Sequence, residues 1–212
     1  LTVADAAAAL DWYRDVLGGI ETTRFVGDDG RVGHAEIVVG GSRLQLADEY
    51  PEIDVHGPGH YGGTSVTLHL EVVDVDHTFG LARDGGAEIE REPSDQFHGN
   101  RNAVIRDPWG HRWMLSQAIT ADRAEAAADA DDGRFGDVRS YDVTGRRPVE
   151  LGYVSMRTGD LERARAFFGA LFSWAVEGGS LEGGGHVGNT RFPLGFMQTG
   201  DGVSDDQPVT LH

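Results

Sequence analysis

The chain has 212 residues, of which 39% are hydrophobic, so it is long enough for one large or two small domains with a packed core. It contains no cysteine, which excludes disulfides, thiolate metal sites and cysteine nucleophiles. Its formal charge of −17 opposes binding to nucleic acids or to anionic membranes. No apolar run approaches the ~20 residues of a membrane helix, and no secretory signal is visible. We therefore expect a cytoplasmic protein.

Strand and helix signals alternate along the first half of the chain. Residues 5–19 indicate a helix, since Asp5 is a typical N-cap and a Gly-Gly pair ends the segment. A strand is expected at 42–48, and residues 66–86 read as a strand followed by a second helix that ends in Gly-Gly. Residues 102–117 form a hairpin around Asp-Pro-Trp-Gly, in which Pro and Gly favour a turn.

Part of this pattern recurs. Val-Thr-Leu-His at 66–69 is repeated at 209–212, and the aromatic helix around 12–17 is echoed at 167–172. Between the copies, residues 118–148 are rich in Ala, Asp, Gly and Arg, with a short acidic helix expected at 121–130. We therefore expect one domain over 1–117 with an incomplete first strand, an acidic linker over 118–148, and a second domain over 149–212 truncated after its first unit.

A strand, a helix and three strands follow one another in this order twice. This pattern resembles the vicinal oxygen chelate superfamily, which includes glyoxalase I, extradiol dioxygenases, fosfomycin-modifying enzymes and bleomycin-binding resistance proteins. The hairpin Asp107-Pro-Trp-Gly-His-Arg-Trp113 is most similar to the bleomycin-resistance-like branch. The resemblance covers residues 1 to about 117 well and 149–212 in part. It implies an α+β fold of paired βαβββ modules, in tandem copies, that form a cupped mixed β-sheet with helices on the outer face.

Strand alternation sorts the sheet residues into two faces. A uniformly apolar set should pack on the helices: Leu44, Leu46, Val66, Leu68, Leu70, Trp113 and Leu115. The opposite face is mixed, and it either lines the cup or is simply a solvated face. Arg43, His34 and Val38 belong to this face. The residues that we predict to bind a ligand are Glu36, Gln45, Thr67, His69, Arg112 and Met114, with Phe97 and Arg101 closing the mouth.

The metal positions of the superfamily fall on Gln45, Thr67 and Met114, and the first-strand position precedes Leu1. A thioether is a poor ligand for hard divalent ions, and neutral side chains do not compensate the charge. A register shift of two residues would replace Thr67 by His69. The corresponding positions of the second copy, Tyr153 and Thr210, are no better. We therefore predict no metal and no cofactor.

Three functions remain open. The first is a metal-free small-molecule binding protein that sequesters an antibiotic or other natural product and is not an enzyme, with a homodimer as a further expected partner. The second is a metal-dependent glyoxalase-like lyase or isomerase, or a dioxygenase, with His34, Glu36, His69 and Glu71 as ligands. The third is an acid–base enzyme that uses His69 or Glu36 without a metal.

Two features stand apart from the cup. His56 and His60 flank Gly-Pro-Gly, and we interpret this segment as a loop with two exposed histidines, with metal chelation as the alternative. Trp109, at the tip of the last hairpin, is interpreted as a surface or interface aromatic.

Overall fold

The computed structural model describes residues 1–130, 150–178, 184–189 and 194–198. The chain divides into two compact units, the first consisting mainly of Leu1–Asp132 and the second mainly of Tyr153–His212. Each unit is described by itself. None of the helices in the described ranges has the length and apolar character that crossing a membrane requires.

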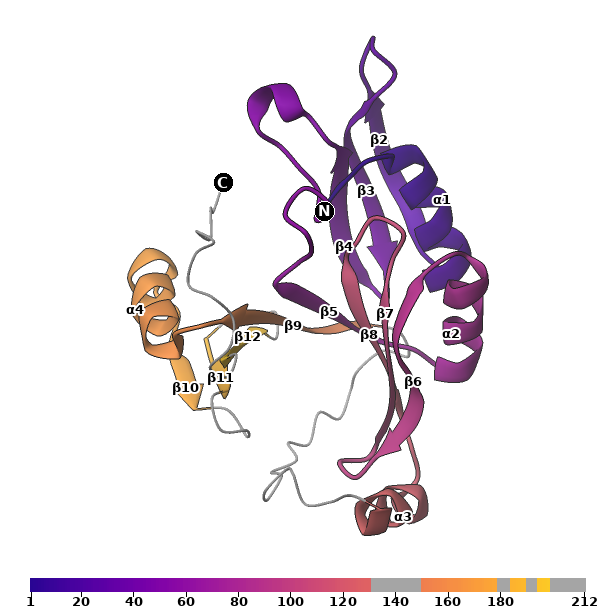
Figure 1. The fold of residues 1–212 in the computed structure, drawn as a ribbon, viewed down its shortest axis with the longest axis vertical. Helices are drawn as coiled ribbons and strands as arrows, with labels where there is room; N and C mark the ends of the chain where they lie inside the picture. The colour runs from indigo at the N-terminus through magenta and orange to yellow at the C-terminus, as the bar shows by residue number, and fades with distance from the viewer. Residues whose placement is uncertain (131–149, 179–183, 190–193, 199–212) are drawn as a thin grey trace. The chain divides into compact units, whose positions relative to one another are not determined.

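Unit 1 begins with a βαβββ module (Figure 1). Its elements are β1 (Thr2–Val3), α1 (Ala6–Leu17), β2 (Ile20–Val26), β3 (Val32–Val39) and β4 (Ser42–Asp48). The strands form one sheet in the order β1-β4-β3-β2, with β1 parallel to β4. Asp5 caps α1 by accepting a hydrogen bond from the backbone N–H of Ala8, and Gly18 ends it at a positive φ of 67°.

A second module of the same topology follows after a short 3₁₀ helix (Pro51–Ile53). Its elements are β5 (Val66–Glu71), α2 (Val75–Asp84), β6 (Glu88–Gln96), β7 (Asn100–Arg106) and β8 (Arg112–Ala118). Within unit 1 they form a sheet in the order β5-β8-β7-β6, with β5 parallel to β8. Asp74 caps α2 as Asp5 caps α1. The expected short acidic helix is confirmed as α3 (Ala121–Ala130).

Unit 2 contains a third module of this kind. Its elements are β9 (Glu150–Thr158), α4 (Leu161–Phe172), β10 (Val176–Gly178), β11 (Gly184–Val187) and β12 (Leu194–Gln198). The order β9-β12-β11-β10, with β12 parallel to β9, repeats that of both earlier modules. Leu161, Val187 and Phe196 form its buried core. The predicted repeat at 209–212 lies outside the described residues.

The core of unit 1 lies between the helices and one face of each sheet. The helices α1 and α2 contact each other, and they cover β3 and β7 respectively (Figure 1). The predicted apolar face is confirmed as buried, except that Val66 is only half-buried. Alternation places these residues toward the helices because every second side chain of a strand shares one face. The α+β fold with mixed sheets is therefore confirmed.

A buried carboxylate ties the first helix to its sheet. Asp48, at the end of β4, accepts hydrogen bonds of 2.6 Å from the backbone N–H of Ala6 and from that of Val32. The first N–H groups of a helix have no partner within the helix, so Asp48 satisfies one of them and also fixes the start of β3.

Candidate functional site

Four of the predicted site residues lie together on the face of the β5–β8 sheet that points away from α2. Thr67 lies opposite Arg112 in the sheet register, and His69 lies opposite Met114. On the other side of β8, Met114 is paired with Val104 of β7. The structure therefore brings an apolar centre and several polar groups onto a single face. We call this surface the β5–β8 face.

Arg112 is held in place by neighbours on this face. Its guanidinium donates hydrogen bonds to Thr67 Oγ1 at 2.7 Å and to Glu90 Oε2 at 2.5 Å. Glu90 also pairs with Arg106 at 2.5 Å. Burial raises the pKa of Glu90, but the hydrogen bond from Arg112 and the charges of both arginines outweigh it, so the pKa lies below its ordinary value. Glu90 therefore stays ionised and fixes the guanidinium of Arg112.

His69 is neutral over the physiological pH range. Burial lowers its pKa to about 4, and the positive charge of Arg112 contributes in the same direction. A neutral imidazole has one ring N–H and one bare ring nitrogen, so it can donate one hydrogen bond and accept another.

Asn102 belongs to the same face and was not predicted as a site residue. It lies opposite Ser116 in the register and is 6% exposed. Its side-chain oxygen Oδ1 has no hydrogen-bonding partner among the described residues. A buried acceptor without a partner costs ~1–3 kcal/mol, so this position favours a donor from outside the chain. The period-two rule applied to β7 could have found Asn102, because it shares the parity of Val104.

Glu36 and Gln45 lie on the other sheet of unit 1. Gln45 Nε2 donates a hydrogen bond to Glu36 Oε1 at 3.2 Å, and Arg43 pairs with Glu36 Oε2 at 3.2 Å. His34 lies 3.6 Å from the same carboxylate. The single predicted lining set is thus divided between two sheets. The reason is that each module of unit 1 forms its own sheet, and the two modules meet through packing around their helices.

Arg101 points away from the β5–β8 face. Phe97 is in the turn between β6 and β7, and its ring contacts that of His98. Arg101 donates two hydrogen bonds of 2.8 Å to Asp76 of α2 and one of 2.9 Å to Asp95. Arg101 is therefore on the helix side of β7, as expected for the residue next to Asn102.

The positions that the superfamily uses for a metal do not fit a divalent ion here. Gln45 is on a different sheet from Thr67 and Met114, and Thr67 Oγ1 already accepts a hydrogen bond from a guanidinium. Met114 offers a thioether, which hard cations bind poorly. In the described parts of the chain, no three His, Asp or Glu side chains come together as metal ligands.

Of the two histidines in the Gly/Pro loop, His60 is exposed as expected, whereas His56 is not. His56 is only 13% exposed at its side chain, and it lies 3.2 Å from Asp54. Its ring stacks on that of His60, with centroids 3.7 Å apart and planes inclined by 10°. The middle of the loop packs inward, since Gly57 and Pro58 are buried.

Comparisons with known proteins agree with this architecture. The family model "Glyoxalase/Bleomycin resistance protein/Dioxygenase superfamily" matches residues 1–115. The chain is 38% identical over 122 residues to an uncharacterized protein of Mycobacterium bovis. The aligned segment covers 56% of this chain and 80% of the relative. A second uncharacterized protein, from Mycobacterium tuberculosis H37Rv, is 38% identical and is covered to 72%.

The chain therefore belongs to the glyoxalase/bleomycin resistance protein/dioxygenase superfamily. Among solved structures, glyoxalase I from Zea mays is 18% identical, with a TM-score of 0.59 over 92% of this chain and 64% of that chain. At that identity the likeness shows the fold alone. Members of the superfamily bind small molecules and often form dimers.

Proposed function

We propose that this protein binds a small organic molecule on the β5–β8 face without the help of a metal ion. The observation that carries the proposal is the buried side-chain oxygen of Asn102, which has no partner among the described residues. It lies on the face that also presents His69, Arg112 and Met114. A ligand that donates a hydrogen bond to Asn102 would remove the cost of the unsatisfied acceptor.

The remaining groups complement such a ligand. Met114 and Val104 supply apolar contact, and the thioether adapts to irregular shapes. His69, held neutral, can donate or accept a hydrogen bond. A small number of polar groups beside an apolar surface is typical of sites that orient a ligand. Sequestration of an antibiotic or other natural product, as in bleomycin-binding resistance proteins, is the activity that we infer from this combination and from the family.

A ligand screen with a matched pair of variants tests the proposal. The probes are bleomycin, as a cationic natural product, and the hemithioacetal of methylglyoxal and glutathione, as a glyoxalase substrate. Binding is measured by thermal shift and then by calorimetry. Asn102→Leu should weaken binding of the active probe about tenfold, the loss expected for a hydrogen bond of ~1.4 kcal/mol. The free protein should be at least as stable as before, because the acceptor that is removed has no partner among the described residues.

Glu36→Gln is the control for this experiment, since Glu36 lies on the other sheet. Binding weakened by Glu36→Gln and untouched by Asn102→Leu would contradict the assignment to the β5–β8 face. Turnover of the hemithioacetal to product would contradict the binding-only function.

Metal content provides a separate test. After removal of metals by a chelator, the protein is dialysed against zinc, nickel or iron(II) and analysed for bound metal. We expect substoichiometric metal in the unmodified protein. Met114→Glu places a carboxylate opposite His69 and should raise metal retention, because it adds an anionic ligand beside an imidazole. Stoichiometric metal in the unmodified protein would overturn the metal-free proposal.

A further inference from the structure

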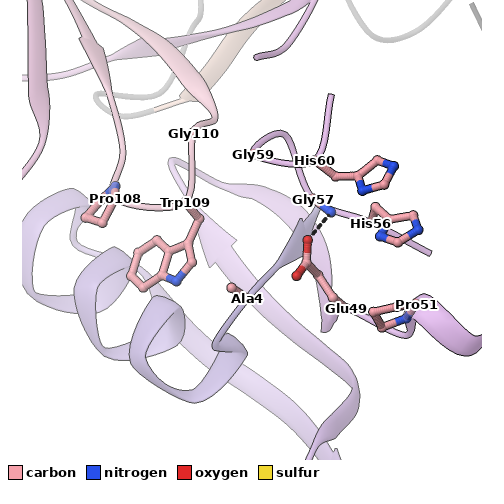
Figure 2. Close-up of a pocket in the computed structure, with 10 residues that line it drawn as sticks. All are labelled: Ala4, Glu49, Pro51, His56, Gly57, Gly59, His60, Pro108, Trp109 and Gly110. Carbon is pink, nitrogen blue, oxygen red and sulfur yellow. Dashed lines mark hydrogen bonds between the residues drawn. The ribbon is translucent and has the colours of Figure 1, made fainter. Parts of the chain in front are cut away.

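A pocket of about 600 Å³ lies apart from the β5–β8 face, between the tip of the β7–β8 hairpin and the connection from β4 to β5 (Figure 2). The hairpin contributes Pro108, Trp109 and Gly110, and the connection contributes Glu49, His56 and His60 among others. Its volume falls within the ~300–1,000 Å³ that is usual for small-molecule sites. Most of its lining is aromatic ring, proline and glycine, with Glu49 as the carboxylate.

Glu49 is fixed by the loop that faces it. Its Oε1 accepts a hydrogen bond of 2.6 Å from the backbone N–H of Gly57 (Figure 2). A Cβ atom at position 57 would lie 2.9 Å from the carbonyl oxygen of Thr2 and 3.1 Å from Glu49 Oε1, so the loop can approach this closely only with glycine there. The second oxygen of Glu49 accepts no hydrogen bond from the described residues and remains available.

Trp109 is also held in a defined position. Its indole packs edge-on against Trp12 at a centroid distance of 6.3 Å, and it lies tilted by 55° against the ring of Tyr13 at 6.0 Å. Its backbone N–H donates a hydrogen bond to Asp107 at 3.0 Å. The ring is thus a pre-positioned wall of the pocket, which reduces the entropy lost when a ligand packs against it.

We propose that this pocket binds a small organic cation, namely a protonated amine carried on an apolar body. The free oxygen of Glu49 would accept a hydrogen bond from the ammonium group, and the indole face of Trp109 attracts positive charge through its quadrupole. The proline and glycine surface accommodates the apolar part. The net charge of −17 raises the local concentration of cations around the molecule.

A metal ion is a poorer occupant of the same pocket. The rings of His56 and His60 stack nearly parallel at 3.7 Å, and a ring nitrogen binds a metal in the plane of its own ring. The ring nitrogens of the stacked pair therefore point along two parallel planes. They cannot both bind one ion. The stacked pair acts instead as a flat side of the pocket.

Nuclear magnetic resonance on the full chain tests this proposal with benzylamine, which is protonated at neutral pH, and with uncharged benzyl alcohol of similar shape. Benzylamine should shift the indole N–H signal of Trp109 and the amide signal of Gly57 in a saturable way. Benzyl alcohol should bind about fivefold more weakly or not at all, because it lacks the charge. Equal affinity for the two compounds would overturn the proposal.

Glu49→Gln is the central variant, since its amide oxygen can still accept the hydrogen bond from Gly57 while the negative charge is lost. It should weaken benzylamine binding about fivefold. Glu125→Gln, an equal change of charge on exposed α3, should leave it unchanged. Equal weakening by the two variants would mean a non-specific charge effect and would refute the site.

A second variant keeps the test independent of the charge of Glu49. Gly59 lines the pocket, and a Cβ atom there would have no atom within 4 Å. Gly59→Leu should therefore fold normally and abolish the benzylamine shifts by filling the pocket. Unchanged binding in Gly59→Leu, or shifts centred on Met114 and Thr67, would place the cation elsewhere and overturn the assignment.

Discussion

The hydroxyl of Tyr13 in α1 donates a 2.6 Å hydrogen bond to the carboxylate of Asp107, 94 residues further along the chain. Asp107 is 3% exposed and also accepts hydrogen bonds from the indole N–H of Trp113 and from the backbone N–H groups of Trp109 and His111. Burial, followed by the charge of Asp107, raises the pKa of Tyr13 well above its ordinary value, so the hydroxyl remains a donor. This contact joins the first module to the last hairpin of the second.

Loss of this contact should lower the free energy of unfolding in two graded steps. Tyr13→Phe removes one donor and should cost ~1–2 kcal/mol, whereas Asp107→Ala leaves several buried donors unsatisfied and should cost ~3–5 kcal/mol. Urea denaturation followed by tryptophan fluorescence measures both. A cost below half a kcal/mol for Asp107→Ala would show that the carboxylate does not hold the modules together.

The low pKa of His69 predicts that stability depends on pH. In the unfolded chain the imidazole takes up a proton as the pH falls below about 6.5, whereas in the folded chain it does so only near pH 4. Protons therefore favour the unfolded state between these values, and the free energy of unfolding should fall by ~3 kcal/mol from this residue as the pH drops from about 6.5 to 4.

The comparison that isolates His69 is the unfolding of His69→Gln and of the unmodified protein over the same pH range. His98 and His111 also have lowered pKa values through burial, and they contribute equally to both proteins. Below pH 6.5 the unmodified protein should therefore lose stability relative to His69→Gln. Parallel curves would mean that His69 is solvated and ionises normally.

The buried face of β5 gives a test of the core. Leu68 is 7% exposed and faces the helices, so Leu68→Ala should cost ~2–5 kcal/mol. Leu81 of α2, which is 38% exposed, is the matched control, and its replacement by Ala should cost ~1 kcal/mol or less. Similar losses in the two variants would indicate that the sheet does not pack on the helices through this face.

Arg101 provides a prediction about position. Its ion pairs with Asp76 and Asp95 are on the helix side of β7, and Asp76 is largely exposed. Arg101→Ala should therefore cost only ~1 kcal/mol of stability and leave binding of the screened ligand unchanged. A tenfold loss of affinity at unchanged stability would return Arg101 to the site at which the sequence interpretation placed it.

How much of the site could be predicted differs from residue to residue. Alternation predicts the common face of Thr67, His69, Arg112 and Met114. These residues share the parity of two strands that are clear in the sequence. Glu90 belongs to a strand with irregular register against β7, where alternation gives no reliable face. The pocket beside Trp109 joins two loops far apart in the sequence, and no periodicity links such segments.

The sequence by itself determined the modules. Aspartate caps, terminal glycines and period-two alternation are local signals, because they depend on hydrogen bonds and side-chain directions within a few residues. Both modules of unit 1 carry these signals, and both adopt the same strand order.

Only the tertiary structure decided how the predicted site residues are grouped. Glu36 and Gln45 lie on one sheet and His69 and Met114 on another, because the modules of unit 1 meet through packing around their helices and through Asp107. Such packing depends on the shape and burial of side chains that are distant in the chain. A local sequence pattern does not predict which distant surface a segment packs against.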